Sequence, residues 1–290
     1  MPVDEKEQER LDIMHTMILA ARPKPQRYHL APFEERLDTF TNEPARVLDL
    51  GHGTGIWLMD MARKYPNTRF DGVDLANMAP NHILPNIDIN PMRDYENPWA
   101  LGESSFDLIH MQMGLGSVRN WAKLYQKIYD HLKPGGWFEH VEIDWTPRSE
   151  NGVFQTGGLW QWWKHVKDVY AGGVGRVIEY NEHTGSLLAD AGFIDTGHVT
   201  FRIPLTCWSR ASREEHASGS WWQTGMGFGP GYGHGLEALS LAALTHHNSW
   251  PPEHARRLCH DALAEANSEH VHAFNVLHVW IAKRPGPPPR

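Results

Sequence analysis

The sequence has almost no cysteine. Only Cys207 and Cys259 occur among its 290 residues, and two thiols cannot form the disulfide framework on which small secreted folds depend. It also lacks a run of about 18 apolar residues, the length at which a helix can span a bilayer. Its first residues are acidic and polar, which is wrong for a signal peptide. These absences predict a protein of a reducing compartment, and we expect it in the cytoplasm, without a membrane partner.

Basic residues are outnumbered as well. The chain has 27 Lys and Arg against 35 Asp and Glu, a formal net charge of −8, and no run of Lys or Arg. This balance argues against a nucleic-acid partner. Neither an HExxH nor a CxxC pattern occurs, so we expect no metal site. The residues in excess are 13 Trp and 19 His, and both types are more frequent in the second half of the chain.

Short apolar segments alternate with helical ones from residue 46 onward. The succession runs through 46–51, 56–66, 69–75, 105–113, 121–132 and 135–143. Strands and helices alternating at this spacing predict an α/β fold, with a mostly parallel sheet covered by helices on both faces. The apolar and polar residues of 272–285 alternate, which predicts an antiparallel last strand.

No linker divides the chain, so we expect a single domain over 1–290. Its predicted parts are an N-terminal helical cover (1–44), a ligand-binding core (45–145), a helical insert after the fifth strand that forms a lid (146–182 and 208–250), and the rest of the sheet and helices (183–207 and 251–285). Helices are expected at 4–21, 33–40, 236–246 and 253–268. The glycine-rich stretch 219–235 is expected to be a mobile loop.

The segment VLDLGHGTGIW (47–57) carries the strongest functional signal. An apolar strand ends near Asp49, and Gly51, Gly53 and Gly55 form a tight turn into a helix. Glycines at such a turn let the backbone approach a ligand closely, and the helix N-terminus offers free N–H groups to an anion. A phosphate loop is excluded because no Lys-Ser or Lys-Thr pair follows.

Further motifs follow this loop in order. Asp74 ends the strand-like segment RFDGVD, and an acid at that place can accept both hydroxyls of a ribose. These two features fit a binding site for either NAD or S-adenosylmethionine. RDYENPW (93–99) then precedes SFDLIHMQ (105–112), and LKPGGWFEHVE (132–142) comes later.

The ordered set resembles the class I S-adenosylmethionine-dependent methyltransferases, which implies their Rossmann-like fold. In that family the first loop holds the methionine part of the cofactor, the second-strand acid holds its ribose, and an Asp after the third strand holds its adenine. S-adenosylhomocysteine is the product. The resemblance assigns cofactor binding to Asp49, Gly51, Gly53, Gly55, Asp74, Leu75, Asp94, Tyr95, Met111 and Gln112.

A narrower resemblance covers nearly the whole chain. EQERLDIMHTMIL, YHLAP, HGTGIW, NPW and LKPGGWFEHVE are similar to the fungal LaeA-type methyltransferases. That family contains small-molecule methyltransferases of secondary metabolism and regulators of it. Its N-terminal helix and arm fold over the cofactor, which implies a lid role for Tyr28 and His29. His52 stands where many class I enzymes carry a smaller residue, at a position that tolerates variation.

Methyl transfer to an O–H, N–H or S–H group also requires removal of a proton. A neutral His suits this task, and His110 and His140 lie near the sheet end where class I enzymes place their substrates. Each candidate has an alternative interpretation as a buried, hydrogen-bonded structural side chain. Further candidates are His15, His29, Glu139 and Glu142.

The tryptophans of the predicted insert suggest a wall for the acceptor. Aromatic faces can pack a flat substrate and can lie near a sulfonium charge. The alternative is that these side chains fill the core or form oligomer contacts. The acceptor contacts expected on this basis are His15, Trp160, Trp163 and Trp222, with Trp162, Trp221, Phe228 and Tyr232 nearby.

Three functions remain open from the sequence. The first is methyl transfer to N, O or S of a small secondary metabolite, with a bulky, flat or heterocyclic acceptor. The second is a LaeA-like regulator that acts through protein partners, in which case a nuclear location is expected. The third is a methyltransferase fold that catalyses a different reaction, such as a cyclisation.

Overall fold

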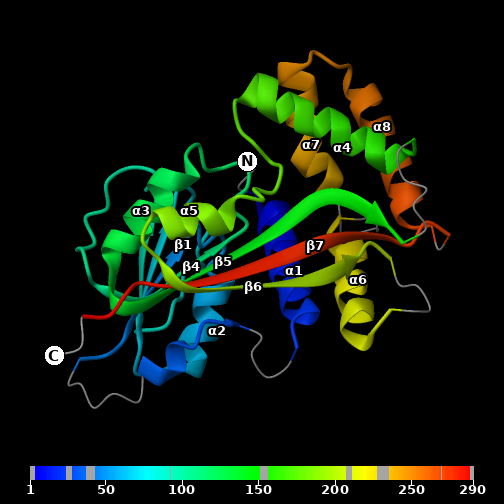
Figure 1. Cartoon of the computed structure of the whole chain (residues 1–290). Coiled ribbons are helices and arrows are strands. Elements are labelled where there is room, and N and C mark those ends of the chain that lie inside the picture. The colour runs from blue at the N-terminus through cyan, green and yellow to red at the C-terminus, as the bar shows by residue number, and fades with distance from the viewer. Residues whose placement is uncertain are drawn as a thin grey trace.

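A seven-stranded sheet forms the centre of the molecule (Figure 1). The computed structural model describes residues 4–23, 28–36, 43–91, 93–150, 156–206, 211–226, 235–268 and 270–287. In these residues the strand order is β3-β2-β1-β4-β5-β7-β6, and only β7 runs antiparallel to its neighbours. The predicted α/β fold, mostly parallel with an antiparallel last strand, is confirmed. The strands are β1 Arg46–Leu50, β2 Arg69–Asp74, β3 Ile87–Pro91, β4 Phe106–Gln112, β5 Leu132–Ser149, β6 Ile194–Pro204 and β7 Ala273–Lys283.

Helices cover both faces of the sheet. They are α1 Glu5–Ala21, α2 Ile56–Lys64, α3 Trp121–His131, α4 Gly158–Val169, α5 Thr184–Asp190, α6 Arg213–Met226, α7 Gly235–His247 and α8 Pro252–Ala266, with short turns η1 Phe33–Arg36 and η2 Tyr170–Val174. Successive residues of a strand point to opposite faces. Leu108 of β4 therefore packs with α2, whereas Ile109 packs with α3. We call these two sides the α2 face and the α3 face.

The N-terminal cover is a helix that lies against the α2 face. Asp4 caps α1 by accepting the N–H of Glu7 at 2.9 Å, and the acidic first turn suits the positive end of the helix dipole. The cover buries an apolar stripe of Met14, Met17 and Ile18 against the long strands β5 and β7 and against α6. This placement brings the first turns of α1 to the end of β1.

A second group of helices forms a cap, which we define as α4, η2, α7 and α8. Figure 1 shows them gathered beyond the parallel half of the sheet, at the far ends of β5 and β7. Helix α8 comes from 251–285, which the sequence analysis described as the rest of the sheet and helices, and it packs on α4 and α7. Small residues let α8 pack closely on α4: a Cβ on Gly158 would lie 2.7 Å from the backbone of Asp261.

Other local expectations also change. Residues 146–149 continue β5 instead of starting the insert, and β3 lies between 75 and 105, a range that the predicted succession of segments leaves out. Residues 219–226 belong to helix α6 and not to the expected loop. The glycines of this segment let α6 approach α1 closely, since a Cβ on Gly225 would lie 2.8 Å from Ile13. The rest of that loop (227–234, with Phe228 and Tyr232), the second half of the helix expected at 33–40, and Cys207 lie outside the described residues.

Candidate functional site

A glycine turn joins β1 to α2, as predicted. Gly51, Gly53 and Gly55 have φ values of +78°, +55° and +77°, and these left-handed conformations favour glycine. Gly55 is the N-cap of α2 and lacks a side chain that could cap the helix. The N–H groups of the first turn of α2 therefore remain available to a ligand at the end of β1.

Asp74 braces this turn from the neighbouring strand. One carboxylate oxygen accepts the N–H of Gly53 and the other accepts the N–H of Ala76, each at 2.8 Å. The next residue, Leu75, leaves 62% of its side chain exposed. A carboxylate beside an open apolar side chain suits a ligand with hydroxyls and a flat ring. The residues present at this edge therefore fit the sugar and base of a nucleoside.

The segment after β3 brings a second acid to the same edge of the sheet. Asp94 accepts the N–H of Glu96 at 2.8 Å, so its carboxylate has a fixed orientation. Tyr95 is buried, and its hydroxyl is hydrogen-bonded to Ser117. The Tyr95 ring lies 3.6 Å from the place of a Cβ on Gly51. Tyr95 thus links the glycine turn to the loop after β4.

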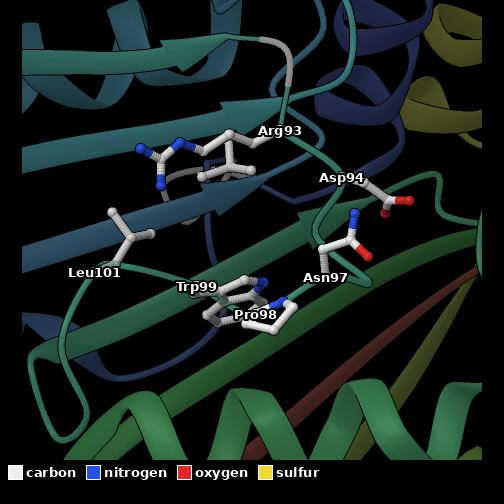
Figure 2. Close-up of a pocket in the computed structure, with 7 residues that line it drawn as sticks. Arg93, Asp94, Asn97, Pro98, Trp99 and Leu101 are labelled. Atoms are coloured by element: carbon white, nitrogen blue, oxygen red, sulfur yellow. The ribbon is translucent and has the colours of Figure 1, made fainter.

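A pocket of about 250 Å³ lies beside this segment, and it is lined by Val73, Arg93, Asp94, Asn97, Pro98, Trp99 and Leu101. Figure 2 shows the Asp94 carboxylate pointing away from Arg93 and Leu101. The part of Asp94 expected to contact a cofactor is therefore directed out of this pocket. The pocket is a hollow on the sheet beneath the β3–β4 connection, distinct from the glycine turn.

A row of buried polar side chains crosses the α2 face beneath α1. Nδ1 of His110 lies 2.9 Å from Oδ1 of Asp49, and the His110 ring stacks on Trp57 at 3.8 Å. Burial raises the pKa of Asp49 to about 7. Burial also lowers the pKa of His110 to about 3. An imidazole with so low a pKa is uncharged at neutral pH and a weak proton acceptor, and the role of His110 as a general base stays a prediction from the sequence.

Glu139 continues the row and anchors the N-terminal arm. It is fully buried, pairs with Arg22 at 3.1 Å, and accepts the N–H groups of Leu30 and Ala31 at 2.6 and 2.9 Å. Burial alone would raise its pKa, but the charge of Arg22, with contributions from His110 and His29, outweighs burial and lowers the pKa. Glu139 is thus a structural anchor instead of the acid or base considered from the sequence.

His140 lies on the opposite side of the sheet from His110. Because His110 pairs in register with Glu139, the next residue of β5 points to the α3 face. Nδ1 of His140 is 3.2 Å from the Tyr125 hydroxyl, and the ring contacts Trp121. The two predicted bases therefore cannot act on one acceptor atom from the same side. Met111 shares the α3 face, whereas Gln112 faces the α2 side at the end of β4.

Glu142 and the N-terminal histidines hold the surrounding loops. Glu142 accepts the N–H of Leu115 at 3.0 Å, just after β4. Nε2 of His15 lies 3.4 Å from Asp60 of α2. His29 uses both ring nitrogens at 2.9 Å, toward the carbonyl of Ala31 and the hydroxyl of Tyr65. The carbonyl of Tyr28 accepts the indole N–H of Trp57 at 2.8 Å, which docks the arm beside the glycine turn.

The tryptophans expected to form an acceptor wall lie in the hydrophobic core instead. Trp162 and Trp163 are each 3% exposed and Trp222 is 2% exposed. They pack with apolar residues of α1, α7 and α8, and Trp160 is partly buried against the same core. The core-filling alternative therefore describes Trp163 and Trp222, whose bulky side chains fill the interior between these helices and the long strands.

In the described part of the chain, no helix combines the length and apolarity that crossing a membrane would require. The same residues contain no group of three or more His, Cys, Asp or Glu side chains arranged to hold a metal ion.

The sequence reasoning missed the contribution of α1 to the glycine turn. Asp12 accepts the Thr54 hydroxyl at 2.5 Å, and Leu11 lies 3.5 Å from the place of a Cβ on Gly53. On the neighbouring turn, Arg10 is 6% exposed and pairs with Glu7. Asp12 falls within the helix predicted at 4–21, and the pattern of that helix alone does not show that one of its acids reaches the glycine turn.

Comparison with known proteins places this site in a family. Residues 24–262 match the family described as a methyltransferase domain. A secondary metabolism regulator of Cochliobolus heterostrophus is 40% identical, over 98% of this chain and 89% of that protein. The protein-methionine methyltransferase laeA of Emericella nidulans is 38% identical, over 98% of this chain and 72% of its own length.

A solved structure supports the same fold at lower sequence similarity. A phosphoethanolamine N-methyltransferase from Haemonchus contortus, solved in complex with S-adenosyl-L-methionine, superposes with a TM-score of 0.50 at 14% identity. The match covers 98% of this chain and 59% of that chain. The class I methyltransferase architecture that the motifs implied is thereby confirmed.

Proposed function

This chain belongs to the methyltransferase family that includes the fungal LaeA-type regulators of secondary metabolism, and we propose that it methylates an acceptor atom that carries no proton. S-adenosylmethionine is the methyl donor that a methyltransferase domain implies. The acceptor that best fits is the thioether sulfur of a methionine side chain in a protein. The relative from Emericella nidulans, named as a protein-methionine methyltransferase, supports this choice.

The donor site follows from the residues at the carboxyl edge of the sheet. The glycine turn and Asp49 would hold the amino-acid end of the donor, Asp74 its ribose, and Leu75 with Asp94 its adenine. When bound, the donor supplies a methyl group already activated by a positively charged sulfur. The protein therefore needs to hold the two reactants in line and exclude water, a positioning effect worth up to about 7–11 kcal/mol.

The observation that carries the proposal is the placement of three predicted bases, His110, His140 and Glu139, each of which is buried and held by a neighbouring side chain. His110 is neutral and stacked on Trp57, and Glu139 is bound to the N-terminal arm. His140 lies against Tyr125 on the other face of the sheet. A thioether sulfur attacks with a lone pair and has no proton to lose, so an acceptor of this kind requires none of them.

A second candidate is methyl transfer to N, O or S of a small metabolite, as the sequence first suggested. The wider family supports it, but an O–H or N–H acceptor needs a base, and the buried tryptophans do not provide an aromatic wall. A reaction other than methyl transfer is a third candidate. A cytoplasmic location, or a nuclear one for a regulator, remains a prediction.

Labelled methyl transfer separates these candidates. The chain is incubated with S-adenosylmethionine carrying a deuterated methyl group, together with the protein or the metabolite fraction of a fungal extract, and both are read by mass spectrometry. We expect label on methionine side chains with the wild type and with Asp88→Ala, an exposed acid of β3, and none with Asp74→Ala. Label confined to nitrogen or oxygen of a metabolite would favour the second candidate, and no label in either fraction would contradict methyl transfer.

A further inference from the structure

Only part of the Arg10 guanidinium has hydrogen-bond acceptors among the residues that the structure describes. Arg10 is 6% exposed, and its Nε and Nη2 donate to the two oxygens of Glu7 at 2.8 and 2.7 Å. Its third nitrogen, Nη1, is buried and has no hydrogen-bond partner among the residues that the structure describes. A buried charged donor left unpaired is destabilising, so Nη1 calls for an acceptor beyond the residues that the structure describes.

The position of Arg10 shows where that acceptor would come from. The following residues, Leu11 and Asp12, contact Gly53 and Thr54 of the glycine turn. Burial raises the pKa of Tyr170, the first residue of η2, and the charge of Arg10 opposes that rise. A Cβ on Gly116 would lie 3.7 Å from the same ring.

Arg10 therefore belongs to the part of α1 that contacts the glycine turn through Leu11 and Asp12. The loop after β4 and the cap meet nearby, where the ring of Tyr170 lies against Gly116. The cap contributes a π-helical turn at this place, and such turns are frequent at functional sites.

The chemistry of the free nitrogen indicates the ligand. The Nε–Nη2 edge of the guanidinium is used by Glu7, which leaves Nη1 and the outer side of Nη2 for a second planar acceptor. Arg22, the other buried arginine of this region, already pairs with Glu139. We propose that Arg10 is the recognition group for a carboxylate at the methyl-transfer site. This inference rests on the proposed function.

Two reactants could supply this carboxylate, the methyl donor and the acceptor. One is the amino-acid end of the methyl donor, and the contact of Leu11 with Gly53 favours it because that end belongs at the glycine turn. The other is the C-terminal carboxylate of a protein acceptor whose last residue is methionine, which would enter between the turn and η2 and for which free L-methionine is the smallest stand-in. In both cases Arg10 positions a reactant through its carboxylate and takes no part in bond formation.

Calorimetry with matched ligands tests the donor arm. Wild type is titrated with S-adenosylmethionine and with its decarboxylated form, and the same is done for Arg10→Gln, Arg10→Lys and the control Arg63→Gln on the exposed side of α2. Loss of one charged hydrogen bond corresponds to about 10- to 100-fold weaker binding. We expect that loss for S-adenosylmethionine on Arg10→Gln, a smaller loss on Arg10→Lys, and none for the decarboxylated ligand.

A second arm tests the acceptor. With S-adenosylhomocysteine bound, wild type and Arg10→Gln are titrated with L-methionine and with L-methioninol, which lacks the carboxylate. A loss confined to L-methionine supports the acceptor as the source. If Arg10→Gln does not fold, the wild type alone still tests the inference. It would be overturned if the wild type bound S-adenosylmethionine no more tightly than its decarboxylated form, and L-methionine no more tightly than L-methioninol. Donor binding without labelled transfer would instead contradict the proposed function alone, and a wild type that binds no donor would overturn both.

Discussion

His110 and Asp49 face each other across the neighbouring strands β4 and β1, with Nδ1 and Oδ1 2.9 Å apart. Both are buried, and the burial acts on them in opposite senses: it raises the pKa of Asp49 to about 7 and lowers that of His110 to about 3. The imidazole is therefore neutral at physiological pH, while the carboxyl group changes charge there. Of these two residues, Asp49 is therefore the one whose charge changes near neutral pH.

Donor affinity is expected to rise with pH. The positive amino group of S-adenosylmethionine favours ionised Asp49, and a carboxyl group with a pKa near 7 is mostly protonated at pH 6. Between about pH 6 and pH 7.5 the ionised fraction rises about eightfold, so the affinity measured by calorimetry should rise by a similar factor. Asp49→Asn should bind more weakly and show a flat profile, and an equally steep profile in this variant would contradict the assignment.

The same shift affects the stability of the protein without ligand. Because the pKa of Asp49 is raised on folding, the native state holds this proton up to higher pH than the unfolded state. The contribution of Asp49 to the free energy of unfolding therefore falls as pH rises from about 4 to about 7. Urea unfolding at several pH values should show this fall for the wild type and its absence in Asp49→Asn; parallel curves would contradict it.

Glu139→Gln is expected to destabilise the fold strongly. Removing one partner of a buried ion pair costs about 3–5 kcal/mol, and Glu139 also holds two N–H groups of the arm. Because its pKa is lowered, the ionised carboxylate stabilises the fold at neutral pH and loses this effect as pH falls below about 4. Urea unfolding of Glu139→Gln, Arg22→Met and the double variant measures the coupling. The anchoring role would be contradicted if the losses of unfolding free energy in the two single variants added up to that of the double variant. It would also be contradicted if Glu139→Gln lost methyl transfer while keeping its stability.

His140→Asn is expected to retain methyl transfer. Its ring is packed between Trp121 and Tyr125 on the α3 face, and a thioether acceptor needs no base. Labelled transfer should fall by less than about tenfold and keep its pH profile, like that of the exposed control His183→Asn. A loss of about 100-fold or more, the effect of removing a general base, together with a changed profile, would restore His140 as a catalytic residue.

Trp163→Ala is expected to act on stability. A buried aromatic residue replaced by alanine costs about 3–5 kcal/mol, and Trp163 is 3% exposed in the core beneath the cap. Trp221, with 40% of its side chain exposed, provides the control, and Trp221→Ala should cost less than about 1 kcal/mol. Both are read from urea unfolding. Unchanged stability of Trp163→Ala with lost methyl transfer would support the acceptor wall.

Local patterns predicted the sheet and the glycine turn because their signals are short-range. The run from Asp49 to Gly55 lies at the end of β1 and Asp74 at the end of β2, as the local pattern predicted, and Asp94 follows β3, as the family resemblance implied. The roles of His110 and Glu139 could not be read in this way, since each depends on partners more than 60 residues away. Gly225 shows the same limit: its contact with Ile13 depends on the packing of two distant helices.

Donor binding to wild type and to Asp74 variants tests the central claim most directly. Calorimetry with S-adenosylmethionine should show about micromolar affinity for the wild type and for Asp88→Ala. It should show no binding to Asp74→Ala and weakened binding to Asp74→Asn, whose melting temperatures verify that they fold. A wild type that does not bind at millimolar ligand, or an Asp74→Ala variant that binds as tightly as the wild type, would contradict the account.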